Sequence, residues 1–183
     1  MKKNLSTATF GGGCFWCTEA VFQALTGVEQ VLPGYMGGEK PNPTYFEVCN
    51  GDTGHVEIVQ IRYDPELVSF EELLLIFFKT HNPTTLNRQG NDVGTQYRSV
   101  VFYHDEAQKK AAEDVIARLE SEQVFADPIV TAIEPAAEFF EAEDYHHNYY
   151  RDNRLKPYCS VIIQPKLEKL LHEFRDKIRE ELL

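Results

Sequence analysis

The spacing of hydrophobic residues along the chain changes several times, which predicts a mixture of strands and helices. Apolar and β-prone residues in short runs, several alternating with polar ones, predict strands, and apolar residues every three or four positions predict helices. The predicted strands cover residues 7–10, 28–36, 55–63, 97–103 and 129–133. The predicted helices follow Cys14, Ser69 and Asp105, and a last one begins at Leu167.

Capping residues support these helices. Ser69 and Glu72 form a capping box, and Asp105 with Gln108 marks another helix start. The inward faces are expected to contain Ala20, Val21, Ala24 and Leu25 in the first helix, Leu73, Leu74, Ile76 and Phe77 in the second, and Ala112, Val115, Ile116 and Leu119 in the third.

The order of the first six elements is strand, helix, strand, strand, helix, strand. This order is typical of the split βαβ arrangement. We therefore expect an α+β fold with a ferredoxin-like split βαβ core, in which helices flank a mixed sheet. The chain is expected to form a single domain over residues 1–183, with 161–183 as a C-terminal helical tail.

Two polar segments interrupt this pattern. Residues 39–50 contain two prolines and are expected to form a loop. Residues 81–96 are long, polar and glycine-bearing, and loops of that length inside a domain are usually functional. We expect the second segment to be an ordered binding loop.

Composition limits the possible partners. The 183 residues include 18 Lys plus Arg and 29 Asp plus Glu, which gives a net charge of −11. That charge argues against a nucleic-acid surface and against binding to an anionic membrane. The start of the chain has no apolar signal-peptide region, and no apolar run approaches the ~20 residues of a membrane span. A cytoplasmic, monomeric protein is the expectation.

The four cysteines are Cys14, Cys17, Cys49 and Cys159, too few for a disulfide scaffold. Cys14 follows three glycines and precedes a predicted helix, so it is expected at a helix N-terminus, where the backbone favours a thiolate. The sequence therefore predicts a reactive sulfur at this position.

Glu57 is the candidate acid. In the predicted strand it shares a face with Val59 and Ile61, and a carboxyl group on an apolar face tends to hold its proton. The alternative is a solvated or ion-paired glutamate at a strand end.

Three chemistries fit these residues. A redox enzyme would use Cys14 as the attacking thiol and a second cysteine to form a disulfide. A thioredoxin-like exchanger would use the Cys14/Cys17 pair. Structural zinc held by these two cysteines with His146 and His147 is disfavoured by the poor spacing of the histidines.

Several motifs together resemble the peptide methionine sulfoxide reductase A family. They run in order through about residues 7–160. They are Gly13-Cys-Phe-Trp16, Gly34-Tyr-Met-Gly-Gly38, Pro43-Thr-Tyr45, Val48-Cys-Asn-Gly-Asp-Thr-Gly-His-Val-Glu57, Asp92-Val-Gly-Thr-Gln-Tyr-Arg-Ser99, the segment 139–146 and Pro157-Tyr-Cys159.

The resemblance implies reduction of the S-epimer of methionine sulfoxide, free or protein-bound, without a cofactor and with thioredoxin as the reductant. Cys14 would become a sulfenic acid and Glu57 would supply the proton. The implied substrate-binding residues are Phe15, Trp16, Tyr45, Asp92, Tyr97 and His146.

The resolving cysteine stays open between two candidates. Cys159 follows the Tyr145-His146 segment much as a recycling cysteine of the family does, and it is expected in a mobile loop. Cys17 is nearer in sequence but would require local unwinding of a helix. Cys49 is interpreted as structural. Some members of the family end in a glycine-rich tail that carries two recycling cysteines. In this chain a helical tail stands in that place.

Overall fold

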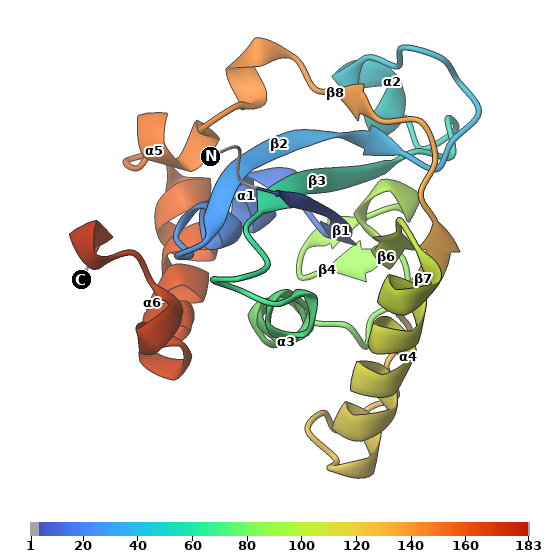
Figure 1. Cartoon of the computed structure of the whole chain (residues 1–183). Helices are drawn as coiled ribbons and strands as arrows, with labels where there is room; N and C mark the ends of the chain where they lie inside the picture. Colours follow the sequence, from blue (N-terminus) through green and yellow to red (C-terminus); the bar gives the residue numbers. More distant parts are fainter. Residues whose placement is uncertain (1–3, 183) are drawn as a thin grey trace.

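A six-stranded mixed sheet forms the centre of the computed structural model, which describes residues 4–182. The strand order is β7-β6-β1-β3-β2-β8 (Figure 1). All neighbouring pairs are antiparallel except β6 and β7. The strands are β1 (Ser6–Gly12), β2 (Val28–Met36), β3 (Val56–Tyr63), β6 (Ser99–Tyr103), β7 (Ala132–Pro135) and β8 (Phe140–Glu141).

The four inner strands, β6-β1-β3-β2, confirm the expected split βαβ core. Helix α1 (Phe15–Gln23) connects β1 to β2, and β3 lies between these two strands. Helix α3 (Phe70–Thr80) follows β3 in the chain and leads towards β6. Each connection therefore returns to the same sheet with one strand lying between the two strands that it joins, as the order of elements predicted.

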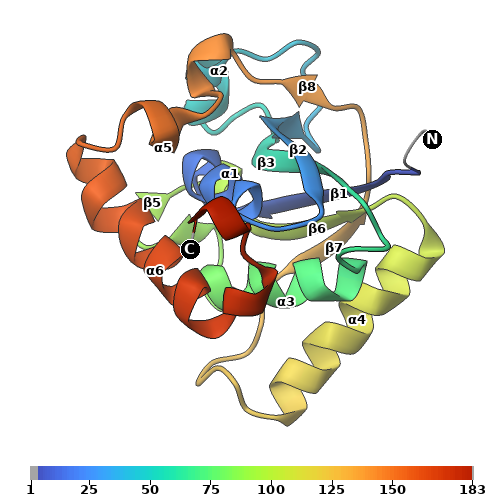
Figure 2. The same ribbon diagram turned by 60° about the vertical axis from the view of Figure 1, so that its left-hand side comes forward.

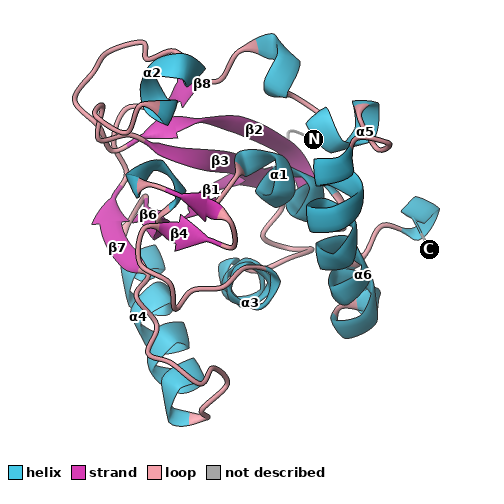
Figure 3. Ribbon diagram, turned by 180° about the vertical axis from the view of Figure 1, so that it is seen from behind, coloured by secondary structure: helices cyan, strands magenta, loops and turns pink. Residues whose placement is uncertain are grey.

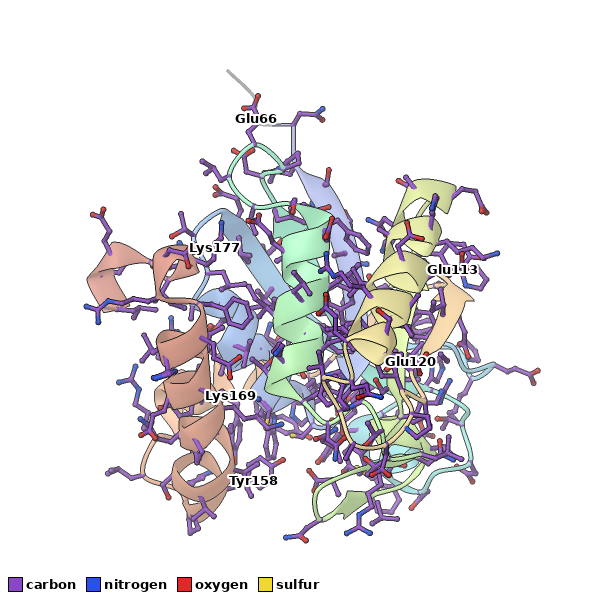
Figure 4. All side chains as sticks on the ribbon, turned by 90° about the horizontal axis from the view of Figure 1, so that it is seen from below. Glu66, Glu113, Glu120, Tyr158, Lys169 and Lys177 are labelled. Carbon is purple, nitrogen blue, oxygen red and sulfur yellow. The ribbon has the colours of Figure 1, made fainter. Side chains whose placement is uncertain are left out.

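Helices cover the sheet and close the core. Figures 1 and 4 show α3 between α4 (Glu106–Ser121) and α6 (Gln164–Glu173). Phe10 of β1 stacks on Phe77 of α3 with ring centroids 4.8 Å apart, and it also contacts Phe22 of α1 at 5.5 Å. The aromatic contacts fix both helices against the central strand.

The predicted helix caps are present. The Ser69 hydroxyl accepts a hydrogen bond from the Glu72 N–H, and Asp105 accepts one from the Gln108 N–H. Both interactions satisfy backbone donors that a helix start leaves without partners.

Segment 39–50 is not wholly a loop, as the sequence suggested, because it contains the short helix α2 (Tyr45–Cys49). Thr44 and Glu47 cap each other's backbone N–H groups in a capping box. The prolines at 41 and 43 precede this helix and so do not interrupt it.

Segment 81–96 is ordered, as expected. It contains the hairpin of β4 (Arg88–Gln89) and β5 (Asp92–Val93). A 3₁₀ turn, η1 (Thr95–Tyr97), follows the hairpin, so β6 begins at Ser99 and not at Tyr97.

The predicted strand 129–133 is shifted toward the C-terminus, since β7 pairs with β6 from Ala132. The remaining short elements are η2 (Asp144–His146) and α5 (Tyr149–Asp152).

The C-terminal tail differs from one continuous helix. A π-helical turn, η3 (Cys159–Ile163), leads into α6, which ends at Glu173, before the turns η4 (Arg175–Lys177) and η5 (Glu180–Leu182). Beyond α6, the backbone of the tail bonds to the turn that follows α1, where the Thr26 N–H donates a hydrogen bond to the Lys177 carbonyl at 2.8 Å. Figure 2 shows this end of the chain folded back beside α1.

One methionine lies in the described part of the chain. Met36, at the end of β2, is fully buried, and its Sδ accepts a hydrogen bond from the Ala137 N–H at 3.5 Å. None of the helices within residues 4–182 has the length and apolar character needed to cross a membrane.

Candidate active site

Cys14 lies where β1 passes into α1, as the sequence predicted. Gly13 has a φ of +92°, which glycine adopts without strain, and Cys14 is the residue that precedes the first turn of the helix. A Cβ at Gly13 would lie 2.6 Å from the Gln89 side chain, so the β4–β5 hairpin packs directly on this turn. Only 7% of the Cys14 surface is exposed.

The thiolate that the sequence predicts at Cys14 is disfavoured by the surroundings of this side chain. Burial raises the pKa of the Cys14 thiol well above its usual range, because desolvation outweighs the favourable position at the helix start. Cys14 also shares a hydrogen bond with Cys17, and this bond lowers the pKa of Cys17 to about 7. A negative charge in this pair is therefore favoured on Cys17.

Glu57 is 1% exposed, which confirms that it belongs to an apolar face of β3. Its Oε2 accepts a hydrogen bond from the Phe15 N–H at 3.1 Å, beside Cys14 in the chain. Burial raises the pKa of Glu57 to about 8, so the carboxyl group holds a proton at neutral pH. Its Oε1 has no hydrogen-bond partner among the described residues.

An aromatic cluster forms one wall beside this carboxyl group. The Phe15 ring lies 4.9 Å from His146 and 6.3 Å from Tyr45, measured between ring centroids. Tyr45 in turn lies 4.4 Å from His146. These three predicted site residues come from α1, α2 and η2, so the fold brings together positions up to 131 residues apart in the sequence.

His146 is fully buried and neutral, since burial lowers its pKa to about 4. Its Nδ1 accepts a hydrogen bond from Trp16 Nε1 at 3.0 Å. The proton of the neutral ring therefore lies on Nε2, which has no partner among residues 4–182. His147 interacts elsewhere, with the Ala142 carbonyl and Glu141, so the two histidines do not converge on the cysteines.

Trp16 is partly covered by aromatic rings. It stacks on Tyr149 at 3.7 Å between centroids, and the Tyr158 ring packs edge-on at 5.7 Å. The exposed part of the Trp16 ring lies next to Phe15 in α1 and extends the apolar wall of the site.

Asp92 and Tyr97 complete the polar side. Asp92, in the hairpin, accepts a hydrogen bond from the Tyr158 hydroxyl at 2.8 Å. The same hydroxyl lies 3.7 Å from the Cys17 Sγ. Tyr97 packs against the buried cluster that contains Cys14, Cys17 and Cys159.

Cys159 is not in a mobile loop, contrary to expectation. It lies in η3, is fully buried, and belongs to the same apolar cluster as Cys14 and Cys17. The prolines and polar residues around positions 157–165 concealed this helical turn in the sequence. All four cysteines are free thiols in the structure.

Sequence reasoning missed Glu143. This carboxylate accepts hydrogen bonds from the Tyr35 hydroxyl at 2.9 Å and from the Tyr45 N–H at 3.0 Å. It therefore holds the first residue of α2 against β2. No pattern in the sequence indicated this role, since Glu143 is one of several acidic residues in segment 134–144.

With this geometry established, comparison with known proteins identifies the family. A sequence model of the family described as Peptide methionine sulfoxide reductase matches residues 6–178. The chain belongs to the peptide methionine sulfoxide reductase family. Peptide methionine sulfoxide reductase MsrA of Saccharolobus solfataricus is 52% identical over 175 residues, covering 96% of this chain and 98% of that protein.

Solved structures of the family share the fold. The reduced form of Mxr1 from Saccharomyces cerevisiae superposes with a TM-score of 0.79 at 33% identity, covering 87% of this chain and 95% of Mxr1. Mxr1 in complex with Trx2 matches at 23% identity with a TM-score of 0.57, covering 81% of this chain and 89% of that one. Membership of this family favours the redox-enzyme hypothesis over the thioredoxin-like and zinc-binding alternatives.

Proposed function

We propose that the chain reduces methionine sulfoxide to methionine with Cys14 as the nucleophile and Glu57 as the acid. The observation that carries this proposal is the buried, protonated carboxyl group of Glu57. Its Oε2 accepts a hydrogen bond from the backbone N–H of Phe15, the residue after Cys14, and its Oε1 has no hydrogen-bond partner among the described residues.

In the first step the Cys14 thiol gives its proton to Cys17, with which it shares a hydrogen bond, and the Cys14 sulfur attacks the sulfoxide sulfur. The methionine sulfur gains two electrons, the Cys14 sulfur loses two, and the oxygen moves to Cys14 as a sulfenic acid. Glu57 donates its proton to the oxygen as the sulfur–oxygen bond breaks, because an unprotonated oxide is a poor leaving group. Tyr45 and Tyr97 donate hydrogen bonds to that oxygen, and burial raises the pKa of both phenols so that they keep their protons.

The walls of the site select the substrate. Phe15 and Trp16 hold the terminal methyl group, Asp92 shapes the polar side, and His146 positions Trp16 by accepting the hydrogen bond from its Nε1. With an apolar wall and an acid at fixed positions, only one sulfoxide epimer presents its oxygen to Glu57. The family resemblance assigns this as the S-epimer.

A second cysteine then resolves the sulfenic acid. The Cys159 thiol attacks the Cys14 sulfur, water leaves, and a disulfide forms. Both Cys159 and Cys17 lie in the same buried cluster as Cys14. We favour Cys159 because it follows the Tyr145-His146 segment much as a recycling cysteine of the family does, and Cys17, which shares a hydrogen bond with Cys14, remains the alternative. A thioredoxin then reduces the disulfide. The complex of yeast Mxr1 with Trx2 supports this partner.

Turnover by cysteine variants tests the proposal. Wild type, Cys14→Ser, Cys159→Ser and Cys17→Ser are assayed with dithiothreitol or thioredoxin. Cys14→Ser is expected to be inactive with both reductants. Cys159→Ser should lose only the thioredoxin-supported turnover, and its Cys14 sulfenic acid should be trapped by a sulfenic-acid reagent after one turnover.

Two results would contradict the scheme. An active Cys14→Ser variant would remove the nucleophile. Loss of thioredoxin-supported turnover in Cys17→Ser, with Cys159→Ser unaffected, would make Cys17 the resolving residue.

In the cell, this activity corresponds to repair of oxidised proteins and of free methionine sulfoxide during oxidative stress. We propose a cytoplasmic location, because a reaction that uses free thiols needs a reducing compartment.

A further inference from the structure

Four large apolar side chains are exposed on segments next to the catalytic residues. They are Phe46, Leu86, Val93 and Tyr145, with 75%, 71%, 68% and 60% of their surfaces exposed. We call these four residues the rim. Figure 3 shows α1 near the middle of the view, with α2 to its upper left and β4 to its lower left.

Two rim residues lie on the side of α2. Phe46 directly follows Tyr45, and the Tyr145 ring lies 6.5 Å from the Tyr45 ring. Tyr145 also packs against His146, with centroids 3.9 Å apart and the ring planes tilted by 42°. Glu143 holds this side in place through its hydrogen bond with the Tyr45 N–H.

The other two lie on the hairpin side. Val93 directly follows Asp92, whose carboxylate receives the Tyr158 hydrogen bond. Leu86 precedes β4, and Gln89 of β4 packs against Gly13, the residue before Cys14. The rim therefore lies on both sides of the place where the sulfoxide would bind.

We propose that the rim binds apolar residues that flank an oxidised methionine in an extended, non-native polypeptide. This inference rests on the proposed function and specifies its substrate class. The rim is continuous with the proposed catalytic site, so a polypeptide bound through its sulfoxide must pass over it.

The apolar character of the residues that would bind the rim follows from where methionine occurs in proteins. Methionine is often buried, and its neighbours in sequence then include apolar core residues. Such segments become accessible when a protein is damaged or unfolded, and they bring apolar side chains with them. In an extended chain, residues one or two positions away lie about 3.3–6.6 Å along the backbone, which places their side chains beside the site.

The experiment compares three substrates: N-acetylmethionine sulfoxide, a pentapeptide with the sulfoxide flanked by leucines, and the same peptide flanked by serines. The enzymes are wild type, the double variant Phe46→Ser/Val93→Ser, and Leu67→Ser. Leu67 is 54% exposed, but its neighbour Glu66 lies at the opposite end of the molecule from Tyr158 in Figure 4. Leu67→Ser is therefore the matched control.

Wild type is expected to show a kcat/KM about tenfold higher for the leucine-flanked than for the serine-flanked peptide, the effect of burying a few tens of Å² of apolar surface. In the double variant this preference between the two peptides should disappear. Its kcat/KM for N-acetylmethionine sulfoxide should change by no more than about twofold, well below the factor of about ten expected for the peptides. Leu67→Ser should keep the preference.

Equal kcat/KM for the two peptides in wild type would overturn the inference, as would an equal loss on all three substrates in the double variant. Failure of wild type to reduce any of the three would instead reject the proposed function.

Discussion

At the scale of single residues, burial has the same effect on the nucleophile and on the proton donor. It raises the pKa of the Cys14 thiol and the pKa of the Glu57 carboxyl group. For Glu57 the consequence is a neutral acid ready to donate a proton. For Cys14 the consequence is a thiol that must lose its proton during the reaction, and Cys17, which shares a hydrogen bond with it and has a pKa lowered to about 7, can accept that proton.

Glu57→Gln should separate these effects. The substitution removes the proton donor, so the rate of sulfenic acid formation is expected to fall about 100-fold or more. In wild type the rate should fall as pH rises through about 8, because Glu57 is protonated below that pKa and charged above it. The variant should lack this alkaline decrease in single-turnover measurements.

Glu113→Gln is the control, since this residue lies on the exposed face of α4 (Figure 4). If Glu57→Gln kept both the wild-type rate and the alkaline decrease, another group would have to donate the proton.

At the scale of elements, two capping boxes support different parts of the molecule. Ser69 caps α3, which packs in the core, and Thr44 caps α2, whose first residue is Tyr45. Both interactions are of the same kind, but only the second orients a predicted substrate-binding residue.

Thr44→Ala and Ser69→Ala should therefore differ in function and not in stability. Each is expected to lower the free energy of unfolding by about 1 kcal/mol, the usual effect of losing an N-cap. Only Thr44→Ala should raise KM for methionine sulfoxide, because Tyr45 loses its fixed position. Urea unfolding and steady-state kinetics measure the two effects, and a similar rise in KM for Ser69→Ala would contradict this assignment.

The long elements could be predicted from the sequence because local signals agree with the tertiary structure. Ser69 and Asp105 begin helices at their capping residues, and β2 has the predicted bounds of residues 28–36. The short helix α2 was missed because prolines 41 and 43 suggested a loop. The turn at Cys159 was missed because its π-helical spacing does not match the 3.6-residue period.

For the site, the position of Cys14 at a helix start and the buried state of Glu57 could be inferred locally, from a glycine turn and an alternating strand. The roles of Glu143, Tyr149 and Tyr158 could not. Their partners lie 66 to 142 residues away, and only the folded chain brings them together.

At the scale of the whole molecule, the C-terminal segment closes the fold against its beginning. Ile178 is 3% exposed and pairs with Leu25, while Arg179 N–H donates to the Ala24 carbonyl at 3.0 Å. Lys177 forms an ion pair with Glu72 at 2.6 Å, which connects the segment to α3 as well.

Ile178→Ala should consequently destabilise the whole domain. Loss of this buried side chain is expected to lower the free energy of unfolding by about 2–5 kcal/mol. Leu182→Ala, at a position 47% exposed, should change it by no more than about 0.5 kcal/mol. Equal effects in denaturant unfolding would show that the segment contributes no packing energy.

The burial of Met36 has a consequence for the enzyme under the conditions in which it works. A thioether is the group that oxidants convert into this enzyme's substrate, yet the Met36 sulfur lies in the core with its lone pair engaged by the Ala137 N–H. Peroxide dissolved in water cannot reach it while the fold is intact. The catalyst is thus shielded, at this position, from the damage that it reverses in other proteins.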